Sequence, residues 1–371
     1  MPANSKIRVA IVFGGQSAEH EISILSARNV LAALDRERFE PVLIGVDKSG
    51  RWLLQDSQRL LESARDPRLV HIQPGAPAQV PSPLSGAVAS GDQLSGTGRI
   101  DVIFPVMHGT LGEDGAMQGL FEVAGIPYVG AGVLGSAIGM DKDVMKRLLR
   151  DAGIAIADFR TIRRDRFDAD PQGVSAELQS LGFPLFTKPA NAGSSVGIRK
   201  VRDAAGVLDA VRHAFEFDTK VIVESAIAGR EIELAVLGGN PATVSVAGEI
   251  IVDHPDGFYS YDAKYIDEKG ARLELPARLS ADELQRAQAL ALETFQVLEC
   301  EGLARVDLFL KADGSLLVNE INTIPGFTAI SMYPKLWGLS GVGPTQLVSR
   351  LIDLALERGR RRSAIRRSIA Q

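Results

Sequence analysis

The chain has 371 residues, of which 45% are hydrophobic and 23% are charged, and its formal net charge is −5. That length favours two or three domains over a single core, and the composition is typical of a globular protein. A net negative charge provides no overall field to attract nucleic acid or an anionic membrane. We therefore expect neither as a partner, and any phosphate-bearing ligand must meet a local cluster of cations.

The single cysteine, Cys300, excludes an internal disulfide, and no Cys/His spacing indicates a zinc site. The first apolar run ends at Gly14-Gly15 and is followed by charged residues, so it predicts a strand and not a signal peptide. No other apolar stretch approaches the ~20 residues of a membrane span. These features predict a cytoplasmic protein.

Alternating strand and helix patterns run through the first part of the chain. The apolar run 7–15 predicts a buried parallel strand that ends in a glycine turn, and 17–34 predicts the helix after it. Further strands are expected at 40–46, 99–109 and 126–130, with a helix at 113–125. The pattern predicts an open parallel α/β sheet. We interpret the Pro-, Gly- and Ser-rich stretch 73–98 as a surface insertion.

A helix at 141–153 is expected to begin a second, smaller unit. Its strands are expected at 157–164, 183–190, 195–201 and 219–229, and its helices near 171–181 and 203–217. The rest is strand-rich from 230 onward, with a helix at 280–299, strands at 302–310 and 315–322, and a last helix near 345–358. The expected domains are 1–140, 141–232 and 233–371. The basic tail 357–371 is interpreted as a solvated, frayed end.

The last two strands predict a hairpin with one acidic face. Asp313-Gly314 is a strong turn signal, and a two-residue turn there pairs Ala312 with Ser315. Counting outward sets Asp307 opposite Glu320 and Arg305 opposite Asn322. Side chains two residues apart share a face, so these four converge on one side. The core side is then formed by Val306, Leu308, Leu310, Leu317 and Ile321.

This acidic face predicts a metal site. Like charges opposite one another destabilise a sheet, yet two carboxylates and an amide oxygen are ligands that Mg²⁺ takes, with phosphate oxygens and water completing its octahedron. The alternative is a solvated polar face on which Arg305 neutralises one acid.

Several features indicate a phosphate-bearing ligand. The run KPANAGSSVGI at 188–198 is not a Walker A sequence, but its small residues allow backbone N–H groups to approach phosphate oxygens. Lys188 ends an apolar strand, where a buried ammonium needs an anion. Lys142 begins a helix, and Lys264 lies in 257–270, a polar, aromatic segment with the character of a mobile lid. The alternatives are a flexible hairpin and solvated surface charges.

The stretch 220–237 predicts two strands joined by a turn that suits a nucleoside. Glu224 ends the first strand and Glu231 lies early in the second. We expect adenine to bond to the backbone of the turn and Glu231 to accept hydrogen bonds from ribose hydroxyls. Surface glutamates are the alternative.

Over nearly its whole length the chain resembles D-alanine–D-alanine ligases of the ATP-grasp superfamily. The matching runs are GGQSAEHEIS, VMHGTLGEDGAMQG, PYVGAGVLGSAIGMDK, KPANAGSSVG, YDAKY, RVDLFL and NEINTIPGFTAIS. The resemblance implies an α/β fold with an α+β C-terminal part, and ATP between the sheets of the central and C-terminal domains. It also implies a homodimer that uses ATP to join two D-alanine molecules through an acyl phosphate, for peptidoglycan synthesis.

The resemblance also implies residue roles, carried over by position. Two ions of Mg²⁺ or Mn²⁺ would be held by Asp307, Glu320 and Asn322. ATP would be contacted by Lys142, Lys188, Ser194, Ser195, Glu224, Ser225, Ile227, Glu231, Lys264, Asn319 and Glu320. The two D-alanine molecules would be bound by Glu19, His108, Arg305, Gly326 and Ser331. The catalytic group would be Glu19, Ser194, Tyr265, Arg305 and Gly326.

Within that catalytic group, Arg305 and the Gly326 N–H would stabilise the oxyanion. Glu19, Ser194 and Tyr265 would form a hydrogen-bonded set that ties the N-terminal domain to the phosphate loop and the lid.

Alternatives remain beside these roles. Glu19 alone is also consistent with a helix-dipole carboxylate, and His108 with a satisfied histidine in a turn. Ser225 stands where some relatives have lysine, which matters little if the backbone makes that contact. Two other functions remain open: a D-alanyl-D-lactate ligase, against which Tyr265 counts by resemblance, and a silent nucleotide-binding regulator, against which the intact acidic set and Arg305 count.

Overall fold

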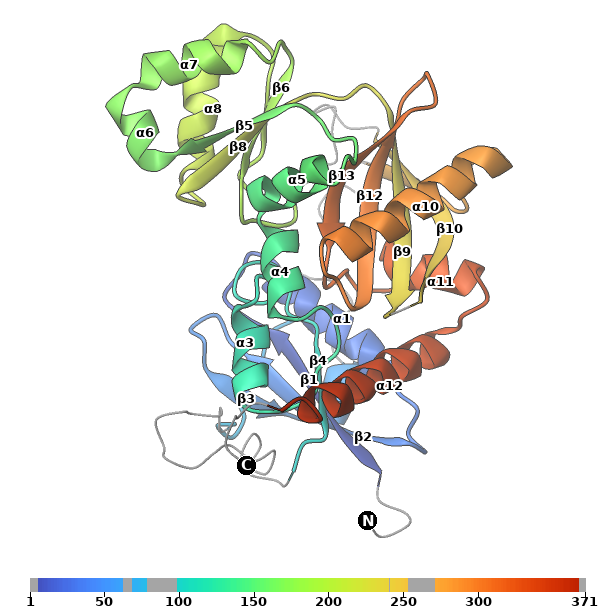
Figure 1. Cartoon of the computed structure of the whole chain (residues 1–371). Coiled ribbons are helices and arrows are strands. Elements are labelled where there is room, and N and C mark those ends of the chain that lie inside the picture. Colours follow the sequence, from blue (N-terminus) through green and yellow to red (C-terminus); the bar gives the residue numbers. More distant parts are fainter. Residues whose placement is uncertain (1–5, 63–68, 79–98, 240, 253–270, 367–371) are drawn as a thin grey trace.

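Three separate sheets organise the molecule (Figure 1). The computed structural model describes residues 6–62, 69–78, 99–239, 241–252 and 271–366. Among these, no helix is long and apolar enough to cross a membrane. The predicted lid at 257–270 and most of the predicted insertion at 73–98 lie outside the described residues.

The N-terminal sheet has the strand order β3-β2-β1-β4. Its strands are β1 (Ile7–Gly14), β2 (Phe39–Val46), β3 (Trp52–Gln55) and β4 (Val102–Pro105). Its helices are α1 (His20–Ala33), α2 (Ser57–Glu62), α3 (Ala116–Val123) and α4 (Val133–Met140). β1 pairs in parallel with β2 and β4 as predicted, whereas β3 forms an antiparallel edge. The strand predicted at 126–130 is wrong, because that segment forms only a bridge between Tyr128 and Ile103.

The central unit begins with α5 (Lys142–Asp151), whose N-cap Asp141 accepts a hydrogen bond from the Val144 N–H. Its antiparallel sheet has the order β5-β8-β6-β7. The strands are β5 (Phe159–Arg163), β6 (Leu185–Pro189), β7 (Arg199–Val201) and β8 (Lys220–Ser225). The helices are α6 (Arg164–Ala169), α7 (Pro171–Gln179) and α8 (Val207–Ala214).

Strand alternation decides what the central sheet presents to the rest of the molecule. Val221 and Val223 of β8 belong to the apolar core beneath the helices. Residues in between point to the other face, so Glu224 faces away from that core, in register with Phe186 of β6. One face of the sheet is thus a packed core, and the other carries charged side chains.

The third sheet is antiparallel, with the order β11-β10-β9-β12-β13. Its strands are β9 (Arg230–Gly238), β10 (Ala242–Val252), β11 (Ala271–Glu274), β12 (Gly302–Leu310) and β13 (Leu316–Asn322). The helices are α10 (Ala281–Val297), α11 (Met332–Leu339) and α12 (Pro344–Ser363). α10 covers one face through Ala287, Ala291 and Phe295. On the opposite face, α11 packs against Ala235 and Leu237 of β9, and the other end of these strands lines a cavity.

The hairpin of β12 and β13 has the predicted register at its acidic end, where Asp307 lies opposite Glu320. The turn itself differs from the prediction. Ser315 does not pair with Ala312; its carbonyl accepts a hydrogen bond of 2.9 Å from the Lys311 N–H. The loop therefore has one more residue than the two-residue turn expected from the sequence, and the predicted pairing at the turn is wrong.

A bulge at Asn319 compensates for the longer turn. The pairing of β13 with β12 skips from Val318 to Glu320, which leaves Asn319 as the extra residue. Because of that shift, Val318 occupies the core position predicted for Leu317. The bulge also brings Asn319 and Glu320, although adjacent in sequence, to the lining of one cavity.

The C-terminal helix α12 is clamped to the N-terminal unit by Arg358. This buried guanidinium donates hydrogen bonds to the carbonyl oxygens of Gly130 and Tyr128, the latter over 2.6 Å. It also lies 4.4 Å from the centre of the Tyr128 ring and 3.3 Å from a Glu301 carboxylate oxygen. The prediction of a frayed, solvated tail at 357–371 is therefore wrong for the first part of that segment.

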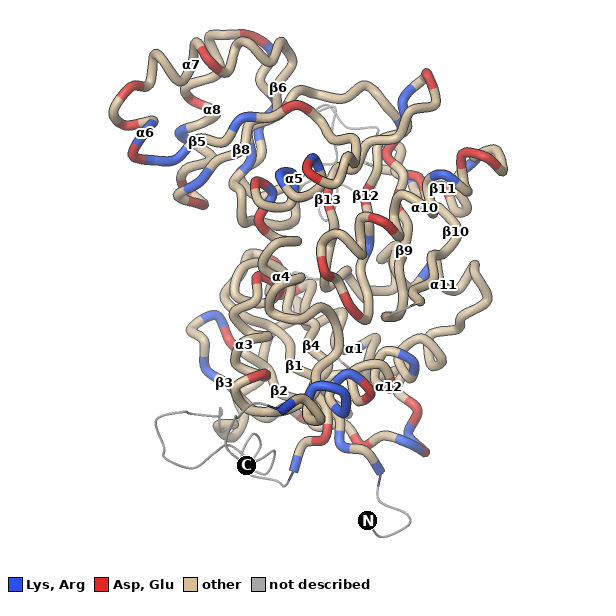
Figure 2. The backbone as a smooth tube through the Cα atoms, in the orientation of Figure 1, with Lys and Arg blue, Asp and Glu red and all other residues tan. Residues whose placement is uncertain are grey.

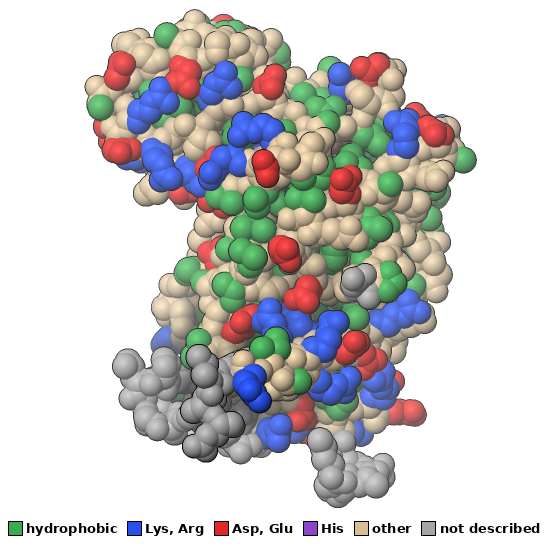
Figure 3. Space-filling view, in the orientation of Figure 1, with side chains coloured by type: hydrophobic (Ala, Val, Ile, Leu, Met, Phe, Trp, Pro, Cys, Tyr) green, Lys and Arg blue, Asp and Glu red, His purple; other side chains and the backbone are tan. Residues whose placement is uncertain are grey.

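Other basic residues follow in the last turns of α12 (Figure 2). The face drawn in Figure 3 shows basic side chains interspersed with acidic ones.

We expect Arg358→Met to weaken the attachment of α12 to the N-terminal unit. The substitution leaves two carbonyl oxygens and a carboxylate without their donor, which costs about 2–4 kcal/mol of unfolding free energy. Thermal and urea unfolding measure the loss. Arg360→Met on the exposed side of the same helix is the matched control, and equal stability of the two variants would contradict the clamp.

Candidate active site

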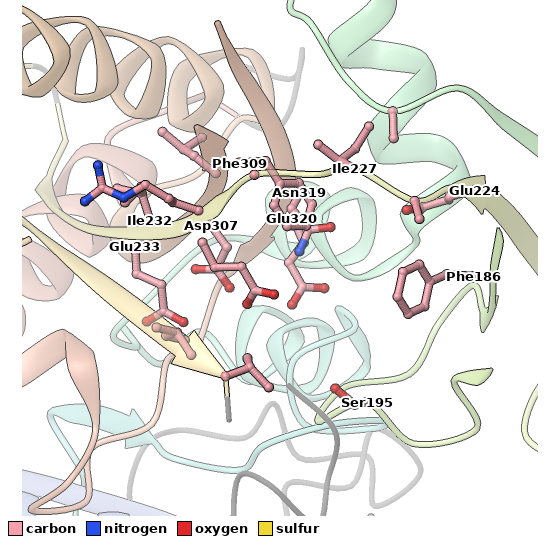
Figure 4. A pocket seen from close by; sticks show the side chains of 18 of the residues that line it. Phe186, Ser195, Glu224, Ile227, Ile232, Glu233, Asp307, Phe309, Asn319 and Glu320 are labelled. Atoms are coloured by element: carbon pink, nitrogen blue, oxygen red, sulfur yellow. The ribbon is translucent and has the colours of Figure 1, made fainter. Parts of the chain in front are cut away.

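A cleft of about 420 Å³ lies between the central sheet and the five-stranded sheet. Its lining includes many of the predicted nucleotide and metal residues: Lys188, Ser195, Glu224, Ser225, Ile227, Glu231, Asp307, Asn319 and Glu320. Figure 4 shows Phe186 and Glu224 on one side, with the side chains of Asp307, Asn319 and Glu320 on the other. Residues from the central and the C-terminal unit therefore form one cavity.

Three carboxylates lie abreast in this cleft. Asp307 of β12 is opposite Glu320 of β13 on one side and opposite Glu233 of β9 on the other, and all three line the cavity (Figure 4). The sequence prediction missed Glu233. It follows Glu231 by two residues in a strand, so the period of a strand could have placed both on one face.

Arg305 offsets two of these acids. Its guanidinium makes two hydrogen bonds of 2.7 Å to the Asp307 carboxylate and lies 3.1 Å from a Glu233 oxygen. Burial alone would lower the pKa of Arg305, but Asp307 and Glu233 raise it well above its ordinary value. Asn322 donates to the same Asp307 carboxylate over 3.0 Å. Arg305 thus neutralises Asp307, as expected for the alternative of a solvated polar face. However, Asp307 lines a cleft and does not lie on an open surface.

The donor set fits a divalent cation. Two aligned carboxylates and an amide present hard oxygen ligands, and the Lys142 ammonium lies 3.5 Å from a Glu320 oxygen. Among the described residues, no group of three or more His, Cys, Asp or Glu side chains is arranged to hold a metal ion without further ligands. Mg²⁺ is commonly bound by one or two carboxylates together with substrate phosphates, so an open set is consistent with that ion.

Lys188 and Glu224 form an ion pair on the other side of the cleft. The Lys188 ammonium donates to one Glu224 oxygen over 2.9 Å, and the ammonium of Lys146 lies 3.4 Å from the other oxygen. Burial opposes the charge on Glu224, but the two lysines hold the pKa of Glu224 below its ordinary value. The sequence prediction missed Lys146, although it lies one helical turn after Lys142 and therefore on the same face.

The glycine- and serine-rich loop joins β6 to β7, and no helix follows it, as expected. Ser194 and Ser195 have φ angles of +47° and +59°, a left-handed backbone conformation that residues other than glycine rarely adopt. The Lys142 ammonium donates to the Ala192 carbonyl over 2.8 Å, and the Ser194 hydroxyl donates to the Glu19 carboxylate. The loop therefore reaches from the cleft to the N-terminal unit.

The predicted D-alanine residues lie where the N-terminal unit meets the chain after β13. Glu19 is the N-cap of α1 but makes no capping bond with its side chain, which accepts from Ser194 instead. The His108 ring contacts the Ile324 carbonyl at 3.0 Å and the Ser26 hydroxyl at 2.9 Å. Both ring nitrogens are thus used, and burial lowers the pKa of His108, which favours the neutral ring.

Gly326 and Ser331 are close neighbours in space. Ser331 is the N-cap of α11, and its hydroxyl accepts a hydrogen bond from the Thr328 N–H over 3.0 Å. A Cβ at Gly326 would lie 2.8 Å from that hydroxyl, so any larger residue there would displace the Ser331 side chain. Lys264 and Tyr265 lie outside the described residues, and their roles stay predictions.

A buried carboxyl group, Glu113, also lies here and was missed by the sequence prediction. It accepts a hydrogen bond of 3.0 Å from the Gly109 N–H. Burial, with the charge of Glu19, raises the pKa of Glu113 to about 8. A Cβ at Gly193 of the phosphate loop would lie 2.7 Å from Glu19 and 3.6 Å from Glu113, so the loop packs directly on this pair of acids.

A cleft between two antiparallel sheets, lined by lysines on one side and a row of carboxylates on the other, is the architecture of an ATP-grasp enzyme. Two family models match the chain, one described as the D-ala D-ala ligase N-terminus at residues 8–131 and one as the D-ala D-ala ligase C-terminus at 148–353. The chain belongs to the D-alanine–D-alanine ligase family.

Known proteins agree with that assignment. The chain is 52% identical to D-alanine–D-alanine ligase A of Chromobacterium violaceum, over 98% of this chain and 99% of the relative. Its fold is similar to the D-alanine–D-alanine ligase from Coxiella burnetii, with a TM-score of 0.83, 38% identity and 96% coverage of both chains. It is also similar to the VanG D-Ala:D-Ser ligase from Enterococcus faecalis, with a TM-score of 0.81, 36% identity and coverage of 95% and 100%.

We expect stability to depend on pH through Glu113. Its pKa is raised in the folded state, so between about 4.5 and 8 the folded protein holds a proton that the unfolded chain has lost. Unfolding free energy should therefore fall as pH rises through that window, by up to about 1.4 kcal/mol per pH unit. Glu113→Gln should lack this component.

The measurement is the difference in unfolding midpoint between wild type and Glu113→Gln at a series of pH values. The groups that face Glu113 are Glu19, Lys142 and two backbone N–H groups, of Gly109 and Ile324. A difference that stays constant from pH 4.5 to 8 would show that Glu113 is ionised throughout.

Proposed function

We propose that this protein joins two D-alanine molecules into D-alanyl-D-alanine, with conversion of ATP to ADP and phosphate, to supply a building block of the cell wall. The observation that carries the proposal is the row of carboxylates in register across β9, β12 and β13, facing lysines across a cleft of nucleotide size. The family membership reported above supports the same reaction.

ATP is placed in the cleft by the roles proposed for its lining residues. Its base lies by Glu224, Ser225 and Ile227, and its ribose lies by Glu231, all of which line the cavity. The phosphates then extend toward Lys188 and Lys142, beneath the loop that carries Ser194 and Ser195, with Asn319 and Glu320 opposite. Lys264, the third lysine assigned to the phosphates, lies outside the described residues.

Asp307, Glu320 and Asn322 would hold Mg²⁺ or Mn²⁺, in all two ions. Such ions offset the negative charge of the phosphates and of the attacking carboxylate. Asp307 is bonded to Arg305 in this structure, so the arginine shares that carboxylate with the ion.

The first half-reaction is mainly a matter of positioning. Glu19 pairs with the ammonium of the first D-alanine, and His108 lies on its other side. The D-alanine carboxylate attacks the γ-phosphorus of ATP, a new P–O bond forms, and ADP leaves. The product is an acyl phosphate, in which the carboxyl carbon has become electrophilic.

In the second half-reaction, Ser331 binds the carboxylate of the second D-alanine. The neutral amine of that molecule attacks the acyl carbon, and Arg305 with the Gly326 N–H stabilises the oxyanion. The tetrahedral intermediate then expels phosphate as the peptide bond forms. Tyr265 and Lys264 belong to the predicted lid, which excludes water from the acyl phosphate.

The organisation of the chain follows the same proposal. We place the domain limits near residues 140 and 232, the first between α4 and α5 and the second near the start of β9. The working form is a homodimer in the cytoplasm, without a nucleic-acid or membrane partner.

The deciding experiment measures ADP release from ATP with and without D-alanine. Release that depends on D-alanine, with D-alanyl-D-alanine as the product, is expected. D-lactate and D-serine are offered in competition across a pH range, because an amine must be neutral to attack whereas a hydroxyl need not be. Nucleotide binding without D-alanine-dependent release would instead favour a silent regulatory protein.

We expect Glu320→Gln to lower kcat by at least about 100-fold, because it removes one charged ligand of the metal site and leaves the rest of the fold in place. Steady-state ADP release at saturating Mg²⁺ measures the effect. Asp313→Asn, in the exposed loop of the same hairpin, is the control. Full activity of Glu320→Gln would remove the metal assignment.

A further inference from the structure

Lys146 is a buried lysine that the reaction above does not use. It lies on α5, 1% of its side chain is exposed, and it does not line the cleft. Its ammonium lies 3.4 Å from Glu224 and 6.0 Å from the centre of the Phe159 ring. Burial of a charged lysine has a large desolvation cost. The burial of Lys146 beside Glu224, a carboxylate that lines the cleft, therefore indicates a role for this lysine.

Lys188 has two anionic partners under the proposed function, Glu224 and the phosphates of ATP. In this structure Lys188 donates to Glu224, but under the proposed function it turns to the phosphates of ATP. A buried carboxylate that loses its only cation is strongly destabilised. Lys146 reaches the other oxygen of the same carboxylate from α5, where it is almost fully buried and does not line the cleft. It can therefore keep Glu224 charged while Lys188 serves the phosphates.

We propose that Lys146 is a positioning residue that holds Glu224 as a fixed, ionised acceptor for the 6-amino group of the purine, and so sets the preference of the enzyme for 6-amino over 6-oxo nucleotides. This inference rests on the proposed function, which puts the base beside Glu224.

The chemistry of the two base types supports the assignment. An ionised carboxylate only accepts hydrogen bonds, so it pairs with the amino group of adenine and repels the 6-oxo group of hypoxanthine or guanine. A neutral carboxylic acid could donate to that oxygen. A site built around a buried polar group discriminates strongly, since the wrong ligand leaves that group unpaired.

The test compares Lys146→Met with wild type, using ATP and ITP as the nucleotides. Methionine keeps the length and apolar stem of lysine and removes the charge. We expect the KM for ATP to rise about tenfold and the ATP-over-ITP ratio of kcat/KM to fall about tenfold, as for loss of a hydrogen bond to a charged group. Because Lys146 touches no reacting atom, kcat and the KM for D-alanine should stay within about twofold.

Arg150→Met is the matched control. Arg150 lies on the same helix and 5.8 Å from the centre of the same Phe159 ring, but it is exposed. This variant should behave as wild type in every measurement. The conservative variant Lys146→Gln, which keeps a donor without the charge, is measured alongside and serves if the methionine variant does not fold.

A double-mutant cycle separates positioning from general damage. In a Glu224→Gln background, Lys146→Met should change the ATP-over-ITP ratio no further, because its effect passes through the carboxylate. Unchanged base preference in folded Lys146→Met, or an equal further loss in the Glu224→Gln background, would overturn the proposal.

Calorimetric dissociation constants for ADP and IDP in Mg²⁺ give a readout that needs no turnover. If wild type shows no D-alanine-dependent ADP release, the proposed function fails. The ADP-over-IDP ratio of wild type and Lys146→Met then still decides the role of Lys146.

Discussion

The site depends on three carboxylates held side by side against their mutual repulsion. Glu233, Asp307 and Glu320 are direct neighbours across three strands, an arrangement that costs stability in a sheet. Arg305 offsets the first two at 3.1 and 2.7 Å, and the Lys142 ammonium lies 3.5 Å from a Glu320 oxygen. A divalent cation bound at this row would add positive charge among the three acids, so its binding would also stabilise the fold.

Much of the β12–β13 hairpin could be predicted from the sequence, although the prediction assumed a two-residue turn that the structure does not have. The turn has Gly314 in the left-handed region, at φ +79°, which suits a three-residue loop with glycine at that position better than a two-residue turn. Such a turn shifts every pair by one residue. The bulge at Asn319 shifts the pairs back before Glu320 is reached. Turn type and bulge are features of the backbone conformation that the residue types indicate only weakly. The pairing of Asp307 with Glu320 could therefore be predicted, but the combination of turn and bulge that produces it could not.

The charged residues missed by sequence reasoning share a physical reason. Lys146, Glu113 and Glu233 are all buried, whereas charged residues in general are exposed. Helical and strand periodicity place Lys146 beside Lys142 and Glu233 beside Glu231, but burial follows from tertiary partners that a pattern of residue types does not contain. No periodic signal exists for Glu113, whose neighbours come from separate segments of the chain.

The phosphate loop joins the two halves of the site energetically. Ser194 and Ser195 hold a left-handed backbone that costs of order 1–3 kcal/mol each, and this cost is offset by contacts on both sides. Lys142 holds the loop from the cleft side and Glu19 from the N-terminal unit. A ligand that orders the loop from the nucleotide side therefore also positions the hydroxyl that binds Glu19. By linkage, a ligand that orders Glu19 would then strengthen nucleotide binding by the same factor, so the loop couples the two halves of the site in both directions.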